Sequence, residues 1–221
     1  MEYEVKLGIA RLGKASVEVK AVEAVRTRPA WKAELRIDGK IPWVYSLVAT
    51  HTTWFDTASL YSLRYHRDQV ERGRERDTYY EIFPERSTYR TKVVPDTMKE
   101  VSSVADPLDE ASFLYFIRTT PLEVGQTYTY QRYFRLDRNP VIIRVLERDT
   151  ISVPAGMDFP AIVIQPSIKT RGLFEEGGKA KIWLSDDQAR IILKIQSEVA
   201  GGAAALHLNL TAYRPPKVAG R

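Results

Sequence analysis

WKAELRIDG, residues 31–39, is the stretch that decides the fold, because apolar and charged side chains alternate along it as far as Asp38-Gly39. A repeat of two is typical of a β-strand that buries one face and leaves the other in water. The apolar positions are Trp31, Ala33, Leu35 and Ile37. Both residues of Asp38-Gly39 tolerate a positive φ, so this dipeptide predicts a hairpin turn at the end of the strand.

The same alternation recurs along most of the chain, between turns rich in Gly, Pro and Asp. It predicts strands at 3–7, 15–19, 31–37, 45–55, 60–70, 78–83, 87–94, 128–136, 141–151, 159–165, 180–184, 191–199 and 204–213. The pattern predicts an all-β (β-dominated) fold, an antiparallel half-barrel or sandwich of roughly a dozen strands. We expect one domain over residues 1–214, with a subdivision near 96–106 as the alternative, and a short tail at 215–221.

One segment, residues 107–118, departs from the alternation and predicts the central helix of the fold. Asp106 and Pro107 supply an N-cap and a proline in the first turn. Apolar residues then follow at spacings of three and four, over more than half of the helix surface. Such a helix must be covered on several sides. We therefore expect a helix of about three turns against the concave face of the sheet.

A ligand cavity between this helix and the predicted strand 128–136 is the first candidate site. A curved sheet capped by an apolar helix often encloses a cavity. Arg132 lies on the apolar face of that strand and needs an anion or an opening to water. A lipid-like ligand with an acidic head group fits both features, and plain core packing is the alternative. The candidate cavity residues are Phe113, Leu114, Ile117, Tyr128, Tyr130, Arg132 and Phe134.

A surface rich in arginine and tyrosine, within residues 61–90, is the second candidate site. Its candidate residues are Arg64, Arg67, Arg74, Arg76, Tyr65 and Tyr79. Basic and aromatic residues together are typical of single-stranded nucleic-acid surfaces, but six acidic residues share this stretch and cancel most of its field. We expect no nucleic-acid partner. Cross-strand ion pairs explain the pattern most simply, and contact with anionic head groups or acidic polysaccharide stays open.

No catalytic residue, metal site or cofactor is predicted. Cysteine is absent, which excludes disulfides and thiolate chemistry. The three histidines, His51, His66 and His207, are not at metal-ligand spacing. Ser112 does not lie on a nucleophile elbow, and Gly177-Gly178 lacks the context of a phosphate loop.

Asp186 and Asp187 are the remaining candidates for acid–base chemistry. Paired carboxylates can serve as general acid and base. A turn between two strands, closed by a pair between aspartate and Arg190, is the simpler interpretation. A hydrolase therefore ranks third among the functions considered.

The composition describes a globular protein. The chain has 221 residues, of which 44% are hydrophobic and 28% are charged, with a formal net charge of +5. No apolar run approaches the roughly 18–20 residues of a membrane-spanning helix. The first residues lack the basic and apolar regions of a signal peptide, which leaves two histories open. The protein is either cytosolic or an exported domain whose leader has been removed.

Several motifs resemble the bacterial domain of unknown function 3108 family. They are Asp106-Pro107-Leu108-Asp109, Ser112-Phe113-Leu114-Tyr115, Pro121-Leu122-Glu123-Val124-Gly125 and Ala180-Lys181-Ile182-Trp183-Leu184-Ser185-Asp186-Asp187. In order and spacing, the likeness runs from about Tyr3 to Tyr213. The resemblance implies an exported, envelope-associated protein with a sheet similar to the half-barrels of lipoprotein carriers. It implies no assigned activity.

The leading hypothesis is a non-catalytic exported protein, periplasmic or elsewhere in the envelope, that binds an apolar or amphipathic ligand on a concave sheet face. The alternative is an interaction module that holds an envelope partner or polysaccharide through exposed strands and the Arg/Tyr surface. The expected partners are a lipid-like molecule or an envelope component. Peripheral association with a membrane is compatible with both hypotheses, and a transmembrane segment is not expected.

Overall fold

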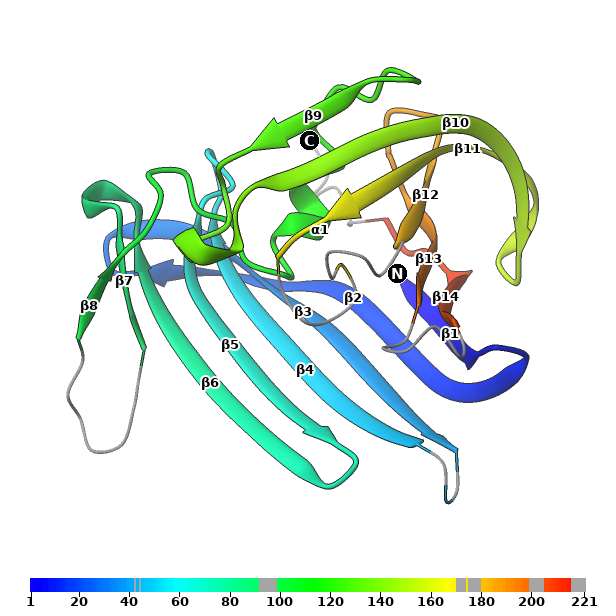
Figure 1. Ribbon diagram of the computed structural model, residues 1–221, viewed down its shortest axis with the longest axis horizontal. Coiled ribbons are helices and arrows are strands. Elements are labelled where there is room, and N and C mark those ends of the chain that lie inside the picture. The colour runs from blue at the N-terminus through cyan, green and yellow to red at the C-terminus, as the bar shows by residue number, and fades with distance from the viewer. Residues whose placement is uncertain are drawn as a thin grey trace, which may run out of the picture.

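The computed structural model describes residues 1–41, 43, 45–91, 99–169, 174, 180–198 and 205–215. Fourteen strands of this described part form one antiparallel sheet, in the order β8-β7-β6-β5-β4-β3-β2-β1-β14-β13-β12-β11-β10-β9 (Figure 1). The sheet curls around the one α-helix found among these described residues and does not close, because β8 and β9 are its edges. The predicted antiparallel, β-dominated fold is confirmed.

The elements have the following bounds. The strands are β1 (Glu2–Leu7), β2 (Ala10–Val25), β3 (Arg28–Ile41), β4 (Tyr45–Asp56), β5 (Ser62–Glu71), β6 (Arg74–Phe83), β7 (Thr88–Thr91), β8 (Glu100–Ser102), β9 (Thr127–Tyr130), β10 (Val141–Val153), β11 (Gly156–Ser167), β12 (Lys181–Ser185), β13 (Ile192–Glu198) and β14 (Ala205–Ala212). The helix α1 is Phe113–Phe116, and two 3₁₀ turns are Pro84–Arg86 and Leu136–Arg138. Strands on both sides of the suggested division at 96–106 belong to this one sheet. Residues 96–98 of that division and 216–221 of the predicted tail lie outside the described residues.

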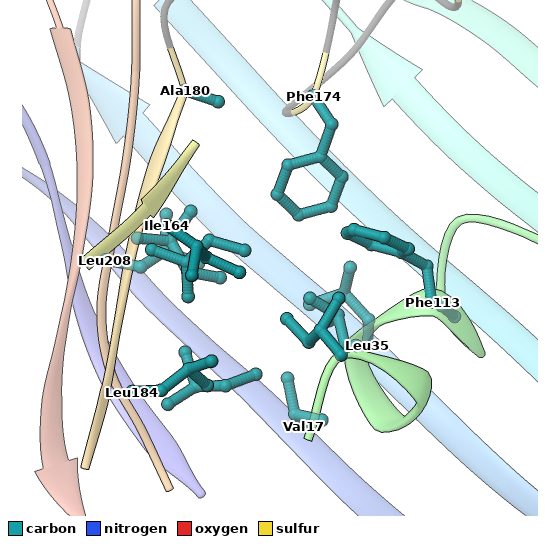
Figure 2. Packing of buried hydrophobic residues seen from close by; sticks show 14 of the residues in the cluster. Val17, Leu35, Phe113, Ile164, Phe174, Ala180, Leu184 and Leu208 are labelled. Carbon is teal, nitrogen blue, oxygen red and sulfur yellow. The ribbon is translucent and has the colours of Figure 1, made fainter. Parts of the chain in front are cut away.

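The apolar and polar residues that alternate in the sequence lie on opposite faces of the sheet. Leu35 on β3 lies opposite Val17 on β2, and both side chains are buried, whereas Glu34 and Arg36 point to the other face. Figure 2 shows inner-face residues of several strands converging on α1, where Phe113 packs against Phe174 with ring centroids 5.3 Å apart. Each large apolar side chain buried in this way stabilises the fold by about 1.5–3 kcal/mol. The core therefore occupies the concave side of the sheet.

The predicted hairpin at Asp38-Gly39 is wrong, because β3 continues through both residues to Ile41. Gly39 lies opposite Gly13 on β2, where the two strands approach closely. A Cβ atom on Gly13 would lie 2.0 Å from the carbonyl oxygen of Asp38, and one on Gly39 would lie 2.6 Å from Cγ of Leu12. Gly39 thus serves close packing of two strands. The alternation pattern could not distinguish this role from a turn.

We expect Gly13→Ala to lower the free energy of unfolding by about 1–3 kcal/mol, because the new methyl group collides with backbone atoms of β3. Denaturant unfolding followed by circular dichroism measures the change. Ser16→Ala on the same strand is the matched control and should change stability by about 0.5 kcal/mol or less. Equal stability of Gly13→Ala and the wild type would show that the strands are not closely apposed at this position.

The predicted helix over 107–118 is too long, since α1 contains one turn, Phe113–Phe116. Leu108 is extended and forms a bridge with Tyr133, in which its N–H donates to the carbonyl of Arg132 and its carbonyl accepts from the N–H of Phe134. Asp109, rather than Asp106, caps the turn. Pairing with a distant segment overrides the local helix signals of Asp106 and Pro107.

The predicted strand over 128–136 is likewise too long, because β9 ends at Tyr130. From there the chain leaves β10 and runs beside Leu108, so that Phe134 is buried while Leu136 is exposed. The residues of this stretch therefore do not share one strand face.

No helix in the described part of the chain has the length and apolar character needed to cross a membrane.

Candidate functional site

An open groove of about 1280 Å³ runs along β2 and beside α1, and we call it the α1 groove. Its inner wall is largely apolar and includes Val17, Val19, Trp31, Phe55, Leu60 and Tyr115. Four of these residues come from the adjacent strands β2, β3 and β4, while Leu60 and Tyr115 close the wall from the loop after β4 and from α1. The rings of Phe55 and Tyr115 lie 5.0 Å apart.

Two apolar side chains of the α1 groove remain open to water. Val19 is 42% exposed and Trp31 is 37% exposed, although Val17 and Ala33 on the same sheet face are buried. The strands β2 and β3 are long, whereas α1 has a single turn and leaves their far ends uncovered. Val22 lies opposite Trp31 and is also exposed. We call Val19, Val22 and Trp31 the uncovered strip. The inner face therefore presents an uncovered apolar surface.

The α1 groove also has polar walls. Arg118 follows α1, and its Nη2 donates to the carbonyl of Ala189 at 2.8 Å while its Nε donates to that of Arg190 at 3.1 Å. These acceptors are neutral, and no carboxylate within the described ranges forms an ion pair with Arg118. The lining continues around the end of β1 to charged residues of the outer face, such as Lys14 and Arg36. The polar lining carries charges of both signs, since Glu2, Glu4, Glu18 and Asp38 also belong to it. One side of the groove thus suits an apolar chain and the other suits a polar group.

The residues of the predicted cavity lie elsewhere. Phe113, Leu114, Ile117 and Phe134 are buried in the core and do not line the α1 groove. Tyr128 and Tyr130 are half-buried on the edge strand β9, where the ring of Tyr130 packs edge-on against Phe116.

Arg132 was expected to need an external anion, but the protein supplies one. Its Nε lies 3.0 Å from an Oδ2 atom of Asp106 and donates to the carbonyl of the same residue at 2.9 Å. The guanidinium also lies 4.4 Å from the ring centre of Phe116. Arg132 is therefore a packing residue that holds the segment before α1.

A buried carboxylate, Asp109, pins the α1 segment to the sheet. Thr53 on β4 and Ser62 on β5 donate their hydroxyls to its Oδ2 at 2.6 and 2.8 Å. The N–H groups of Ala111 and Ser112 donate to its Oδ1 at 2.8 and 2.9 Å. Burial raises the pKa of Asp109, and these hydrogen bonds oppose that rise. Ser112 belongs to this network, which gives its hydroxyl a structural role.

A second buried cluster surrounds Glu110. Tyr65 and Tyr133 donate to its carboxylate at 3.0 and 3.3 Å, and Arg67 lies 3.6 Å away. Nδ1 of His51 lies 2.6 Å from the Tyr65 hydroxyl and 3.4 Å from Glu110. Burial favours the neutral acid, but the contacts with His51, Arg67 and Tyr65 outweigh it and lower the pKa of Glu110 to about 2. His51 thus has an acidic neighbour that its sequence spacing did not reveal.

The predicted Arg/Tyr surface is divided between the two faces of the sheet. Tyr65 and Arg67 face inward, as part of the Glu110 cluster. Arg64 and Tyr79 are on the outer face, where both contact Glu81, at 2.6 and 2.8 Å. Arg64 lies directly opposite Glu81, which is the cross-strand pairing that the acidic residues indicated.

The rest of that surface consists of exposed charges. Arg74 and Arg76 are exposed at the start of β6. Burial and the neighbouring Glu81 raise the pKa of Tyr79 to about 12, so this hydroxyl stays protonated at neutral pH. The six candidate residues therefore do not form one continuous binding surface.

The remaining sequence candidates occupy ordinary positions. Nε2 of His66 contacts exposed Asp77 at 2.7 Å, and His207 is half-buried on β14, where burial lowers its pKa. Gly177-Gly178 lies outside the described residues. Within the part of the chain that the structure describes, no three His, Asp or Glu side chains gather as a metal site.

The turn interpretation of Asp186 and Asp187 is confirmed, with a different arginine. Oδ1 of Asp187 accepts from the N–H groups of Ala189 and Arg190, and Asp186 pairs with Arg148 at 2.8 Å. The partner comes from β10, beyond the reach of a local sequence argument.

The fold and the groove define a class, that of open, β-barrel-like antiparallel sheets. A crystal structure from Brucella abortus, described as a β-barrel-like protein of domain of unknown function DUF1849, is similar over 94% of this chain and 93% of that chain, with a TM-score of 0.59 and 8% identity. At this identity the likeness concerns the fold alone. The family model described as "Protein of unknown function (DUF3108)" matches residues 2–209, and the chain belongs to that family, as its motifs indicated. No curated protein matches the chain.

Proposed function

We propose that the protein is a non-catalytic binding protein whose α1 groove takes an apolar or amphipathic ligand. The observation that carries this proposal is the exposure of Val19 and Trp31 on the inner face of the sheet, within the groove. Ligand pockets are concave and mostly apolar, with a few polar groups that fix orientation. Burial of the uncovered strip by an apolar chain provides the driving force for binding.

The polar end of the groove selects the head group. Arg118 carries a charge that only carbonyl oxygens contact within the described ranges, which favours an anionic head group over a cationic one. An acidic amphipath, with its chain along Trp31 and its head at Arg118, satisfies both walls. Such a ligand would contact Trp31 and Arg118 and not the buried residues Phe113, Leu114, Ile117 and Phe134.

Export to the cell envelope forms part of the proposal and is supported by the family resemblance of the sequence. A carrier or receptor for amphipaths would act there on lipid-like molecules or envelope components. The alternative interaction module has less support, since the Arg/Tyr surface is divided between two faces and its outer part is paired with Glu81.

Titration with a fluorescent fatty-acid probe tests the groove. We expect the wild type to bind the probe and Trp31→Glu to bind it at least about tenfold more weakly, because a charge then interrupts the apolar wall. Arg118→Gln should weaken the binding of an acidic probe several-fold and leave the binding of its uncharged alcohol analogue unchanged. Val48→Glu is the matched control, since Val48 is equally exposed but on the outer face of β4. A wild type without probe binding, or equal binding by Trp31→Glu, would contradict the proposal.

A further inference from the structure

The turns at one end of the sheet project two large apolar side chains into water. Ile9 lies in the turn between β1 and β2, and Trp43 lies between β3 and β4; both are fully exposed. Gly13 and Gly39 are paired across β2 and β3, and each of the two apolar residues lies four positions beyond this pair. Both turns therefore lie beyond the same end of the β2–β3 ladder.

The backbone at Trp43 favours this projection. Its φ is +64°, in the left-handed region, where bulky residues are rarely found. A tryptophan at this position exposes its whole indole at an energetic cost, with no packing within the described part of the chain to compensate. Single exposed apolar residues are common on proteins, but here two separate turns at the same end of the sheet each carry one.

Basic residues lie in and beside the turns at this end of the sheet. The turn between β5 and β6 lies at the same end of the sheet, and residues 7–11, 39–47 and 70–76 together contain five cations and two carboxylates. The cations are Arg11, Lys40, Arg72, Arg74 and Arg76, and the carboxylates are Glu71 and Glu75. We call this end of the sheet, with Ile9, Trp43 and these five cations, the tip rim.

We infer that the tip rim docks on the surface of an anionic lipid bilayer. Tryptophan is enriched at the membrane–water interface, where its ring spans apolar and polar layers. Arginine and lysine beside it are attracted to anionic head groups, by about fivefold in binding for each cation near the surface. The combination of apolar tips and adjacent cations fits a head-group layer better than it fits a neutral or cationic partner. This inference does not depend on ligand binding in the α1 groove.

Co-sedimentation of the full chain with vesicles tests the inference. We expect binding to vesicles of mixed phosphatidylglycerol and phosphatidylcholine, weak binding to phosphatidylcholine alone, and loss of binding at high salt. Trp43→Ala should lower the partition coefficient by about tenfold. Arg74→Gln with Arg76→Gln should lower it by about 25-fold, because two cations are removed, and for anionic vesicles only. Met157→Ala is the matched control, because Met157 is an exposed apolar residue near the start of β11, outside the three turns of the tip rim.

Three results would overturn the inference. One is a wild type that does not bind anionic vesicles. Another is equal binding by Trp43→Ala and Met157→Ala. The third is a concentration-dependent dimer in sedimentation analysis that Trp43→Ala abolishes, which would assign the tips to a second copy of the chain. Trp31→Glu should bind vesicles like the wild type, so that failure of the groove proposal and failure of this inference are distinguishable.

Discussion

Asp109→Ala is expected to lower the free energy of unfolding by about 3–5 kcal/mol, as removal of a fully bonded buried group does. The Asp109 carboxylate accepts two hydroxyl groups from β4 and β5 and two backbone N–H groups at the start of α1. Alanine would leave these donors buried without an acceptor. Because the same carboxylate joins the sheet to α1, the helix should detach before the sheet unfolds.

Denaturant unfolding followed by circular dichroism, together with hydrogen exchange of the amides in residues 111–117, measures both effects. Asp187→Ala is the matched control: Asp187 also accepts two backbone N–H groups, but in an exposed turn. Asp187→Ala should lower the free energy of unfolding by about 1 kcal/mol. Equal effects of the two substitutions would contradict the view that Asp109 anchors α1.

Glu110→Gln is expected to lower the free energy of unfolding by about 3–5 kcal/mol at neutral pH, because it leaves the charge of Arg67 largely buried without its nearby carboxylate. The wild type should also show an acid dependence that this variant lacks. The pKa of Glu110 is about 2 in the folded protein, below its ordinary value of 4.5. Its contribution is therefore complete above about pH 4.5 and is lost as the pH falls toward 2.

Urea unfolding at a series of pH values between 2 and 7 tests this prediction. The difference in stability between wild type and Glu110→Gln should shrink steadily below about pH 4.5. Glu147→Gln, an exposed position on β10, should follow the wild type at every pH. A constant difference across the whole range would show that Glu110 does not act through its charge.

The strands were predictable from the sequence, but the places where the chain departs from its local hairpin and helix signals were not. Alternation is a local property, and it predicted the antiparallel sheet because each strand buries one face. The role of Gly39 depends on Gly13, and the extended conformation of Leu108 depends on Tyr133. In both cases a partner distant in sequence decides the conformation, and local hairpin and helix signals cannot report that partner.

The candidate site was harder to predict than the fold. The aromatic residues of 113–134 indicated an apolar site next to a helix, and the helix does lie against the concave face. The short length of α1, however, leaves the ends of β2 and β3 uncovered and moves the open surface to Val19 and Trp31. The Glu110 cluster was missed because its members come from four separate segments of the chain. A polar residue at a buried position of an alternating strand, such as His51, is the signal that could have indicated it.

Quenching of Trp31 by a brominated fatty acid tests the central claim most directly, since bromine quenches an indole only at short range. The chain contains four tryptophans, so the difference between the wild type and Trp31→Phe isolates the signal of the groove residue. We expect saturable quenching in the wild type that the unbrominated acid reverses, and loss of that component in Trp31→Phe. Identical quenching in both proteins, or quenching that never saturates, would contradict ligand binding in the α1 groove.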